Sequence, residues 1–363
     1  MTTGDHDGGS GSRGSHSRRT AFELSPSDGD QPAGRVMALV LAEEVPAIAS
    51  FSPKLDWDSD RRSRKLHKYR LALRRAKTLL IAADTVFPPR LATSAFDAVS
   101  NELQRTAQLR NLDVLTGSLT SWPQFLDPGL HAGLGKIAAV VEERRDAEFT
   151  SVLEMIDSVE HANMVDQLRA LGTVFRLGGE EPGPDVLVSA GKVARVSFNA
   201  AWSRAQKAGE SAMDSTDADD WHRLRRRLKR ARYLLDALGP ILTYPDEARD
   251  TAWFGDRDHR SPSLVESTRL GTVGSMGSMG ASRGASTVDA QKAAKQMRKL
   301  LRDLGELQDM AVEAELLREV GRQLGNKAAM SAGAMINPVQ MEIPGQVRRS
   351  RKRWKKLRRF SLD

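Results

Sequence analysis

The sequence contains one basic helical pattern twice, and this repeat limits the folds that the chain can adopt. Residues 67–77 and 222–232 both follow H-x-x-R-x-x-x-(R/K)-R-A-(K/R), with corresponding positions 155 residues apart. On a helix that turns about 100° per residue, each segment places its large apolar side chains on one face. The predicted core faces consist of Leu66, Tyr69, Leu73, Ala76 and Leu80 in the first segment and of Trp221, Leu224, Leu228, Ala231 and Leu235 in the second.

The remaining apolar residues also recur mostly at helical spacing, and alternating strand-like runs are scarce. A second, weaker match supports the repeat: residues 109–113 (Leu-Arg-Asn-Leu-Asp) resemble residues 307–309 (Leu-Gln-Asp), and their leucines are 198 residues apart. The additional 43 residues of spacing are close to the length of one Gly/Ser/Met-rich insert. The sequence therefore predicts an all-α protein made of two related helical units, with one insertion in the second.

Composition along the chain predicts the following organisation. Residues 1–33 are rich in Gly, Ser and Asp and are expected to form a disordered tail. Residues 34–177 form the first helical repeat, 178–185 are a Gly/Pro linker, and 186–363 form the second repeat. A flexible insert is expected at about 256–286.

The face opposite each core face is a stripe of cations. In the first motif, His67, Arg70, Arg74 and Lys77 lie within about 80° of one another on the helix, and Arg75 lies just beyond. The second motif repeats this arrangement with His222, Arg225, Lys229 and Arg232. Like charges three and four positions apart repel one another, so a stripe of this kind, present twice, predicts an anionic ligand that offsets the repulsion. Arg, Lys and protonated His all donate charge-assisted hydrogen bonds to phosphate oxygens.

Charge is concentrated in three segments of the chain. Residues 61–77, 222–232 and 348–359 hold nine, seven and nine basic residues and no acidic residue, whereas the rest of the chain has 30 basic against 47 acidic residues. This asymmetry favours a focused positive surface for a polyanion. In the third segment Trp354, Leu357 and Phe360 can dock a terminal helix that extends this surface, although a nuclear-localisation-like or RNA-binding run remains an alternative.

Several classes of chemistry have no signature in the sequence. The chain has no Cys, which removes disulfides, thiol nucleophiles and zinc-thiolate sites. It contains no P-loop, G-x-G-x-x-G, G-x-S-x-G or H-E-x-x-H pattern, and the cations around His67 and His222 oppose a metal ion. Asp113 and Asp309, the acids associated with the repeat, are expected on a helix surface or as ion-pair partners of the Arg stripe. We predict no catalytic residue, no metal and no cofactor.

No apolar run reaches the roughly 18 residues of a membrane span, and no secretion signal is visible at the start of the sequence. We therefore expect a soluble, cytoplasmic protein without a membrane partner.

The two motifs resemble the signatures of the CHAD domain, the conserved histidine α-helical domain. The family patterns H-x-x-R-V-x-x-R-R-x-R and H-x-x-R-x-x-x-K-x-x-R-Y are similar to residues 67–77 and 222–233, and the L-G-x-x-x-D element is matched by residues 304–309. The chain departs from the family at Ala107, where Gly is usual, at Asn111, where Asp is usual, and by its insert. The resemblance covers roughly residues 35–360.

This resemblance implies one compact helical domain with two pseudo-symmetric halves, whose basic helices face a shared surface or a central groove. CHAD domains bind inorganic polyphosphate, and some are found at polyphosphate granules. Some are fused to a CYTH triphosphatase domain, an acidic metal-binding barrel that this chain does not resemble, so no enzymatic role is implied.

The hypothesis is a non-catalytic cytoplasmic protein that binds inorganic polyphosphate, with polyphosphate granules as its expected place of binding. The predicted binding residues are His67, Arg70, Arg74, Arg75, Lys77, His222, Arg225, Arg226, Lys229, Arg230, Arg232, Tyr233, Arg351, Lys355 and Arg358. One alternative is nucleic-acid binding, against which the basic stripes offer few aromatic side chains for base stacking, with Tyr233 as the exception. A metal-dependent phosphohydrolase that uses the histidines is the other alternative.

Overall fold

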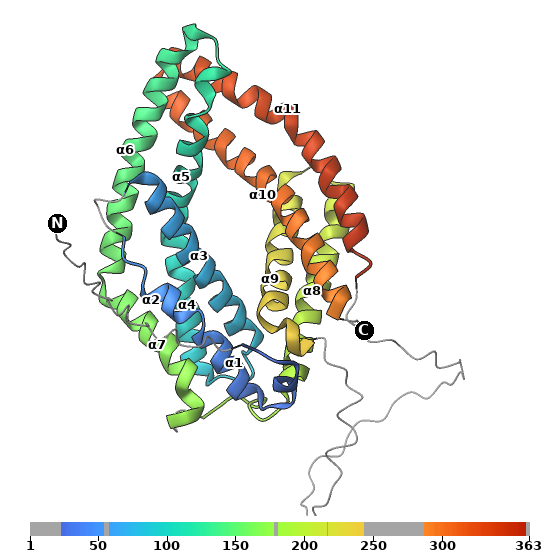
Figure 1. Cartoon of the computed structure of the whole chain (residues 1–363). Helices are drawn as coiled ribbons and strands as arrows, with labels where there is room; N and C mark the ends of the chain where they lie inside the picture. The colour runs from blue at the N-terminus through green and yellow to red at the C-terminus, as the bar shows by residue number, and fades with distance from the viewer. Residues whose placement is uncertain (1–22, 54–57, 178–180, 216, 243–286, 361–363) are drawn as a thin grey trace, which may run out of the picture.

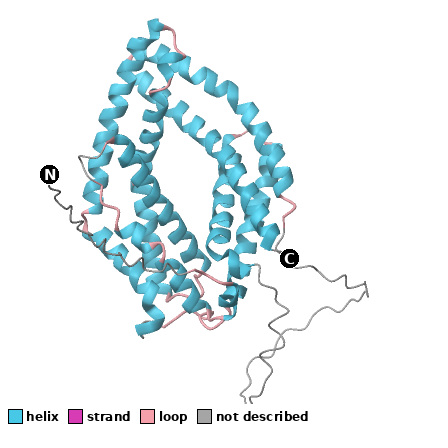
Figure 2. Ribbon diagram, viewed as in Figure 1, coloured by secondary structure: helices cyan, strands magenta, loops and turns pink. Residues whose placement is uncertain are grey.

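The computed structural model describes residues 23–53, 58–177, 181–215, 217–242 and 287–360. Within these residues the chain is helical, and its β structure is a single isolated bridge between Pro32 and Ser189 (Figure 2). The α-helices are α1 (Ala33–Ala42), α2 (Val45–Ala49), α3 (Ser59–Ala82), α4 (Pro89–Arg105), α5 (Ala107–Leu119), α6 (His131–Ile156), α7 (Val159–Leu177), α8 (Ala190–Asp214), α9 (Ala218–Leu242), α10 (Thr287–Leu324) and α11 (Asn326–Leu357). The all-α prediction is confirmed.

The two halves of the sequence lie on opposite sides of the molecule and contact each other near both of its ends (Figure 1). Helices α1–α4 and α7 lie opposite α8 and α9, while the long helices α6 and α11 run from the two sides to a common tip (Figure 1). There α6 packs against α10 and α11, and α5 packs against α6. Helix α3 of the first half contacts α9 of the second half, so the two basic motifs lie on neighbouring helices.

The apolar faces predicted for the two motifs are buried. Leu73 and Ala76 on α3, and Leu224 and Leu228 on α9, are completely shielded from solvent in the larger hydrophobic core. A second core lies at the common tip, where residues such as Leu115, Ile137, Leu317 and Met335 come together. Because both apolar faces are used for packing, the polar faces of α3 and α9 are left for other contacts.

The N-terminal boundary of the fold differs from the prediction. Residues 26–30 form a 3₁₀ helix that contacts α8 and α9, and Ala33 begins α1 with no exposed surface. The Ala33 amide donates to the Val188 carbonyl at 2.7 Å, and the Gly34 amide donates to the Val186 carbonyl at 2.9 Å. The predicted tail of residues 1–33 is therefore too long, because these long-range bonds hold its last part. Residues 1–22 lie outside the described residues.

The later part of the predicted linker is also fixed to the first half. The Gly183 amide donates to the Val86 carbonyl at 3.1 Å, and an added Cβ at Gly183 would lie 2.3 Å from the Thr85 carbonyl oxygen. Only glycine allows this close approach of two backbone segments. The predicted insert at about 256–286 lies outside the described residues, and the pseudo-symmetry of the two halves stays a prediction.

Candidate functional site

The site is built on α3 and α9, whose starts are defined by acidic residues. The Asp58 carboxylate caps α3 by accepting a hydrogen bond from the Arg61 amide at 2.7 Å, and Asp60 lies in the first turn. Helix α9 has Asp219 and Asp220 in its first turn. Acids at a helix N-terminus interact favourably with the helix dipole. These acids therefore stabilise the first turn of each helix, which precedes the run of cations.

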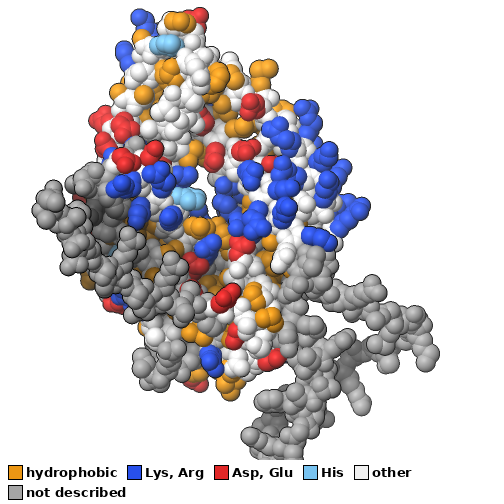
Figure 3. Space-filling model, in the orientation of Figure 1, with side chains coloured by type: hydrophobic (Ala, Val, Ile, Leu, Met, Phe, Trp, Pro, Cys, Tyr) orange, Lys and Arg blue, Asp and Glu red, His pale blue; other side chains and the backbone are white. Residues whose placement is uncertain are grey.

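Six basic side chains from three helices form one interacting group. We call His67, Arg70 and Arg74 from α3, Arg110 from α5, and Arg225 and Lys229 from α9 the central cluster. Charges from the two halves interact within the cluster. Arg74 and Arg70 lower the pKa of Lys229, Arg74 lowers that of Arg225, and Lys229 lowers that of His67. In Figure 3 Lys and Arg side chains gather on both sides of a hollow in this face of the molecule. The structure thus brings residues from both motifs together.

The central cluster has an unfavourable electrostatic environment for its own charges. Burial, reinforced by Arg225 and Arg74, lowers the pKa of Lys229 to about 7. Burial, with Arg74 and Arg110 nearby, lowers the pKa of Arg70 to about 9. Burial also lowers the pKa of His67, to which the cations Arg110 and Arg74 contribute further. Desolvation and like charges both disfavour the protonated form, and at Lys229 they outweigh the opposite effect of Asp309.

Arg70 and Arg225 occupy the same position in the two motifs but have different hydrogen-bond partners. The Arg70 guanidinium is buried and donates to the Leu103 carbonyl at 2.8 Å and to the Thr106 hydroxyl, at the junction of α4 and α5. Arg225 is partly exposed and donates from Nη1 to the Gln308 side-chain carbonyl at 2.8 Å on α10. An added Cβ at Gly305 would lie 3.4 Å from Arg225 Nη2, so Arg225 lies close to α10. Gln308 also forms a hydrogen bond with His222, which partly offsets the lowering of the His222 pKa by burial and Arg226.

Other predicted residues of the two motifs have partners outside the central cluster. Arg75 forms an ion pair with Glu44 at 3.6 Å, and the Lys77 ammonium lies 4.7 Å from the centre of the Phe96 ring. Arg232 forms an ion pair with Asp236 at 2.8 Å. Arg230 interacts with Arg204, Arg227 and Asp84 instead. These contacts hold the four cations outside the central cluster, so the predicted stripe is wider than the cluster that the fold assembles.

Tyr233 does not offer a stacking surface. Its side chain is buried, with 8% of its surface exposed, and it acts electrostatically on Arg225. The expectation of an exposed aromatic residue at this position is wrong, because the last turns of α9 bury both the Leu235 and the Tyr233 sides of the helix in the core.

The C-terminal basic segment is the last part of α11. Trp354 is completely buried, its ring lies 6.0 Å from that of Trp202, and an added Cβ at Gly209 would overlap it. The docking predicted for Trp354 and Leu357 is therefore confirmed. Arg351 donates to the Ser215 carbonyl at 2.9 Å, while Lys355 and Arg358 are exposed. Basic side chains of α11 form the right-hand edge of the face in Figure 3.

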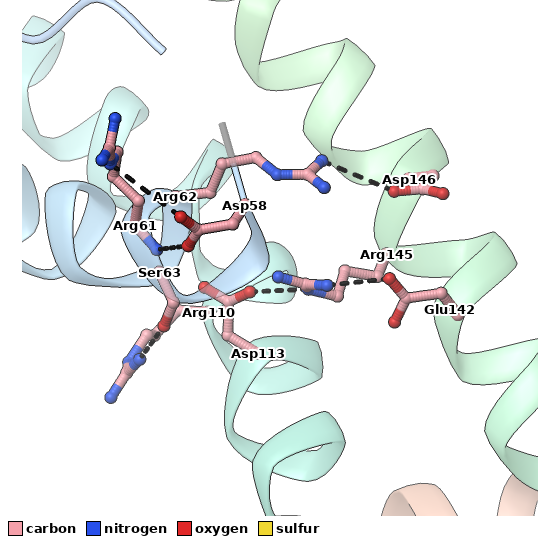
Figure 4. A network of polar contacts seen from close by, with 9 residues as sticks. All are labelled: Asp58, Arg61, Arg62, Ser63, Arg110, Asp113, Glu142, Arg145 and Asp146. Atoms are coloured by element: carbon pink, nitrogen blue, oxygen red, sulfur yellow. Dashed lines mark hydrogen bonds and ion pairs between the residues drawn. The ribbon is translucent and has the colours of Figure 1, made fainter. Parts of the chain in front are cut away.

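The two motif-associated acids have different surroundings. Asp113 accepts a 2.8 Å hydrogen bond from Arg145 on α6, and both side chains are almost fully buried (Figure 4). Its predicted role as a partner of the Arg stripe is therefore wrong, since Arg145 lies outside both motifs. Asp309 on α10 interacts with Arg225, Arg110 and Lys229 and belongs with the central cluster.

Comparison with known proteins identifies the fold. The CHAD domain family profile matches residues 47–252, which is more than half of the chain. The chain belongs to the CHAD domain family. The crystal structure of the CHAD domain from the plant Ricinus communis is similar with a TM-score of 0.63 and 18% sequence identity, covering 94% of this chain and 96% of that chain. PptA from Streptomyces chartreusis is similar with a TM-score of 0.51 and 13% identity, covering 89% of this chain and 99% of that chain. A search of curated proteins found no match.

The matched range of this CHAD protein contains both basic motifs but ends before Gln308 and Asp309. Arg110 is the central-cluster residue that sequence analysis did not include among the binding residues. Its signal was present in the weaker repeat, where Arg110 follows Leu109 as Gln308 follows Leu307. The structure adds that Arg110 acts on His67, Arg70 and Asp309 and donates to the Ser63 hydroxyl at 3.1 Å.

In the described part of this CHAD protein, no group of three or more His, Cys, Asp or Glu side chains is arranged to hold a metal ion. None of the described helices combines the length and the apolar character needed to cross a membrane.

Proposed function

We propose that this CHAD protein binds inorganic polyphosphate at the central cluster without converting it chemically. One observation carries the proposal: cations from α3, α5 and α9 are held together in a partly buried position where Lys229 has a pKa of about 7. An anion that binds in such a cluster stabilises the fold, because its negative charge favours the protonated forms of Lys229, Arg70 and His67.

Unused hydrogen-bond donors support a ligand with many acceptor atoms. The buried Nε atoms of Arg70 and Arg225 have no hydrogen-bond partner among the described residues. Phosphate oxygens accept hydrogen bonds from arginine at adjacent nitrogen atoms. Consecutive phosphates of a chain would let Arg70 and Arg225, from opposite halves, bind the same molecule.

A phosphate chain suits the site better than a nucleic acid. Proteins that bind single strands use exposed aromatic side chains on which bases stack, and Tyr233 is buried here. The exposed cations at the end of α11, such as Lys355 and the C-cap residue Arg358, provide a second contact region for a chain that extends from the central cluster. This agrees with the polyphosphate binding known for members of the CHAD family.

The charge of the site supports the proposal of a non-catalytic role. Phosphoryl transfer normally uses carboxylates to hold Mg²⁺ beside the phosphate. The central cluster consists of cations, which oppose a bound Mg²⁺ ion, and Asp309 is the acid that interacts with them. We therefore propose binding alone, in the cytoplasm and at polyphosphate granules.

The test is a competition titration with labelled long-chain polyphosphate at two salt concentrations. Unlabelled polyphosphate should displace the label, whereas RNA and duplex DNA at the same phosphate concentration should displace it far less. Equal displacement by all three would replace the proposal with a general polyanion surface. Release of phosphate in the presence of Mg²⁺ would contradict the non-catalytic role.

The cellular part of the proposal needs a separate test. A fluorescent fusion of the full chain should co-localise with stained polyphosphate granules, and the variant Arg74→Gln/Lys229→Gln should be diffuse. A diffuse distribution of the unmodified chain in cells that contain granules would contradict the granule association.

A further inference from the structure

Asp309 is an acid beside the central cluster. It lies on α10, which packs against α5 and α9, and it directly follows Gln308, whose side-chain carbonyl accepts a 2.8 Å hydrogen bond from Arg225. The cations Arg225, Arg110 and Lys229 favour its charged form, whereas partial desolvation and the neighbouring Glu306 oppose it. Desolvation has the largest effect, so the pKa of Asp309 is raised above its ordinary value. The carboxylate thus lies beside the same cations to which a phosphate would bind.

Other acids of the molecule show that this arrangement is not the common one. Asp303, also on α10, accepts a direct 2.8 Å contact from Arg353, and Asp113 accepts one of the same length from Arg145. Asp309 interacts with its cations through charge, without such a direct ion pair among the described residues. Removal of its charge therefore breaks no short ion pair that holds helices together.

The first half lacks an acid at the matching position. When the two weaker repeat segments are aligned at Leu109 and Leu307, Arg110 matches Gln308 and Asn111 matches Asp309. The first half thus supplies an additional cation where the second half supplies a neutral amide followed by a carboxylate. The negative charge is confined to one side of the cluster.

We propose that Asp309 is an internal counter-anion that competes with the phosphate ligand for Arg110, Arg225 and Lys229, and so sets how tightly this chain holds polyphosphate. This inference rests on the proposed function. With the site empty, the carboxylate lowers the repulsion among the three cations. With a phosphate chain bound, it repels the ligand, so part of the binding free energy is lost and release is faster.

The direct experiment measures polyphosphate affinity of the full chain and its variant Asp309→Asn by isothermal titration calorimetry. It is done at about pH 6, where Lys229 with its pKa of about 7 is mainly charged. Asp309→Asn should bind about tenfold more tightly, because it removes one negative charge from beside the ligand. Without ligand its melting temperature should not fall, because at Asp309 desolvation of the carboxylate outweighs its favourable interactions with the cations.

Two further variants give the experiment its controls. Glu319→Gln removes the same charge from the same helix at an exposed position, where Glu319 pairs with Arg144 at 2.8 Å, and should leave the affinity unchanged within about twofold. Asn111→Asp places a carboxylate at the matching position of the first half and should weaken binding. It also tests the inference independently if Asp309→Asn does not fold.

The outcomes separate this inference from the proposed function. If the unmodified chain does not bind polyphosphate, the proposed function fails. If the unmodified chain binds and Asp309→Asn binds equally or more weakly, the function stands and the counter-anion role is overturned. Equal tightening by Asp309→Asn and Glu319→Gln would likewise overturn it, because the effect would then come from net charge alone.

Discussion

The two basic motifs have almost the same pattern of residues, but the fold uses them differently. Arg70 in the first motif is buried and donates to a backbone carbonyl and a hydroxyl of its own half. Arg225 in the second motif is partly exposed and donates to one side-chain amide, that of Gln308. A backbone acceptor is fixed, whereas a glutamine side chain can rotate away. The first motif therefore supplies a rigid cation and the second an adaptable one.

The halves also differ in the charge beside each motif. Arg110 adds a cation next to His67 and Arg70, whereas Gln308 and Asp309 add an amide and an acid next to His222 and Arg225. Sequence similarity between repeats is thus compatible with a division of roles. The first half provides most of the positive charge, and the second provides the groups whose charge and position respond to a ligand.

The largest effect is expected from a double variant that tests whether the two halves bind polyphosphate as one site. The double variant Arg74→Gln/Lys229→Gln removes one cation from each half at the point where they interact and should weaken polyphosphate binding about 100-fold. Its melting temperature should not fall, because repulsion is relieved. The affinity is measured by calorimetry.

The control for this double variant is Lys77→Gln/Arg230→Gln, which removes one cation from each motif outside the central cluster. Its affinity should change by about threefold or less. Similar losses in both double variants would show that total charge, rather than the assembled cluster, binds the ligand.

The second prediction separates the rigid from the adaptable arginine. Arg70→Ala should lower the free energy of unfolding by about 2 kcal/mol, because it removes a buried side chain with two hydrogen bonds. Arg225→Ala should lower it by about 0.5 kcal/mol, since a partly exposed side chain with one bond is lost. Urea unfolding measures both values, and equal losses would remove this distinction between the motifs.

The third prediction concerns pH. The pKa of Lys229 in the folded chain is about 7, below that of an unfolded lysine, so the unfolded state binds more protons above pH 7. The stability of the ligand-free chain should therefore rise with pH between about 7 and 9.5, and this rise should be smaller in Lys229→Gln. Thermal unfolding at a series of pH values measures it.

The same group should couple polyphosphate binding to proton uptake. Since the ligand favours charged Lys229, affinity should fall about tenfold from pH 6 to pH 8.5. Lys229→Arg keeps its charge over this range and should show a flatter profile. An equally steep profile in Lys229→Arg would assign the pH dependence to another group.

The smallest expected effect is that of the histidines. The pKa of His67 and that of His222 are both lowered, first by burial and then by nearby arginines, so both are charged only in acid. His67→Ala and His222→Ala should each weaken binding about twofold at pH 5.5 and less at pH 8. Equal losses at both pH values would indicate a structural role for these residues.

Much of the fold and part of the site could be predicted from local sequence pattern. Helical spacing alone places Leu73 and Leu228 in the core and Arg74 and Lys229 on the opposite face, because a residue's direction on a helix depends only on its position along it. The doubled motif likewise indicated an anion. The buried Trp354 followed from its spacing to Leu357.

Tertiary structure decided which cations share a site. Arg75 and Lys77 follow the same pattern as Arg74, but Glu44 and Phe96, both distant in sequence, hold them elsewhere. Arg110 contributes to the cluster from a different helix, and the Tyr233 side chain is buried in the core rather than exposed on the surface. Residues 23–33 become part of the fold through bonds to residues near 188.

The sequence by itself determined the helices, their apolar faces and the presence of two cationic stripes, since these depend on neighbours within a few residues. Only the tertiary structure decided that α3 and α9 lie next to each other, that Lys229 loses hydration among cations of the other half, and that Asp309 faces them. Burial and charge interactions depend on distance in space, and the packing of all helices together fixes those distances.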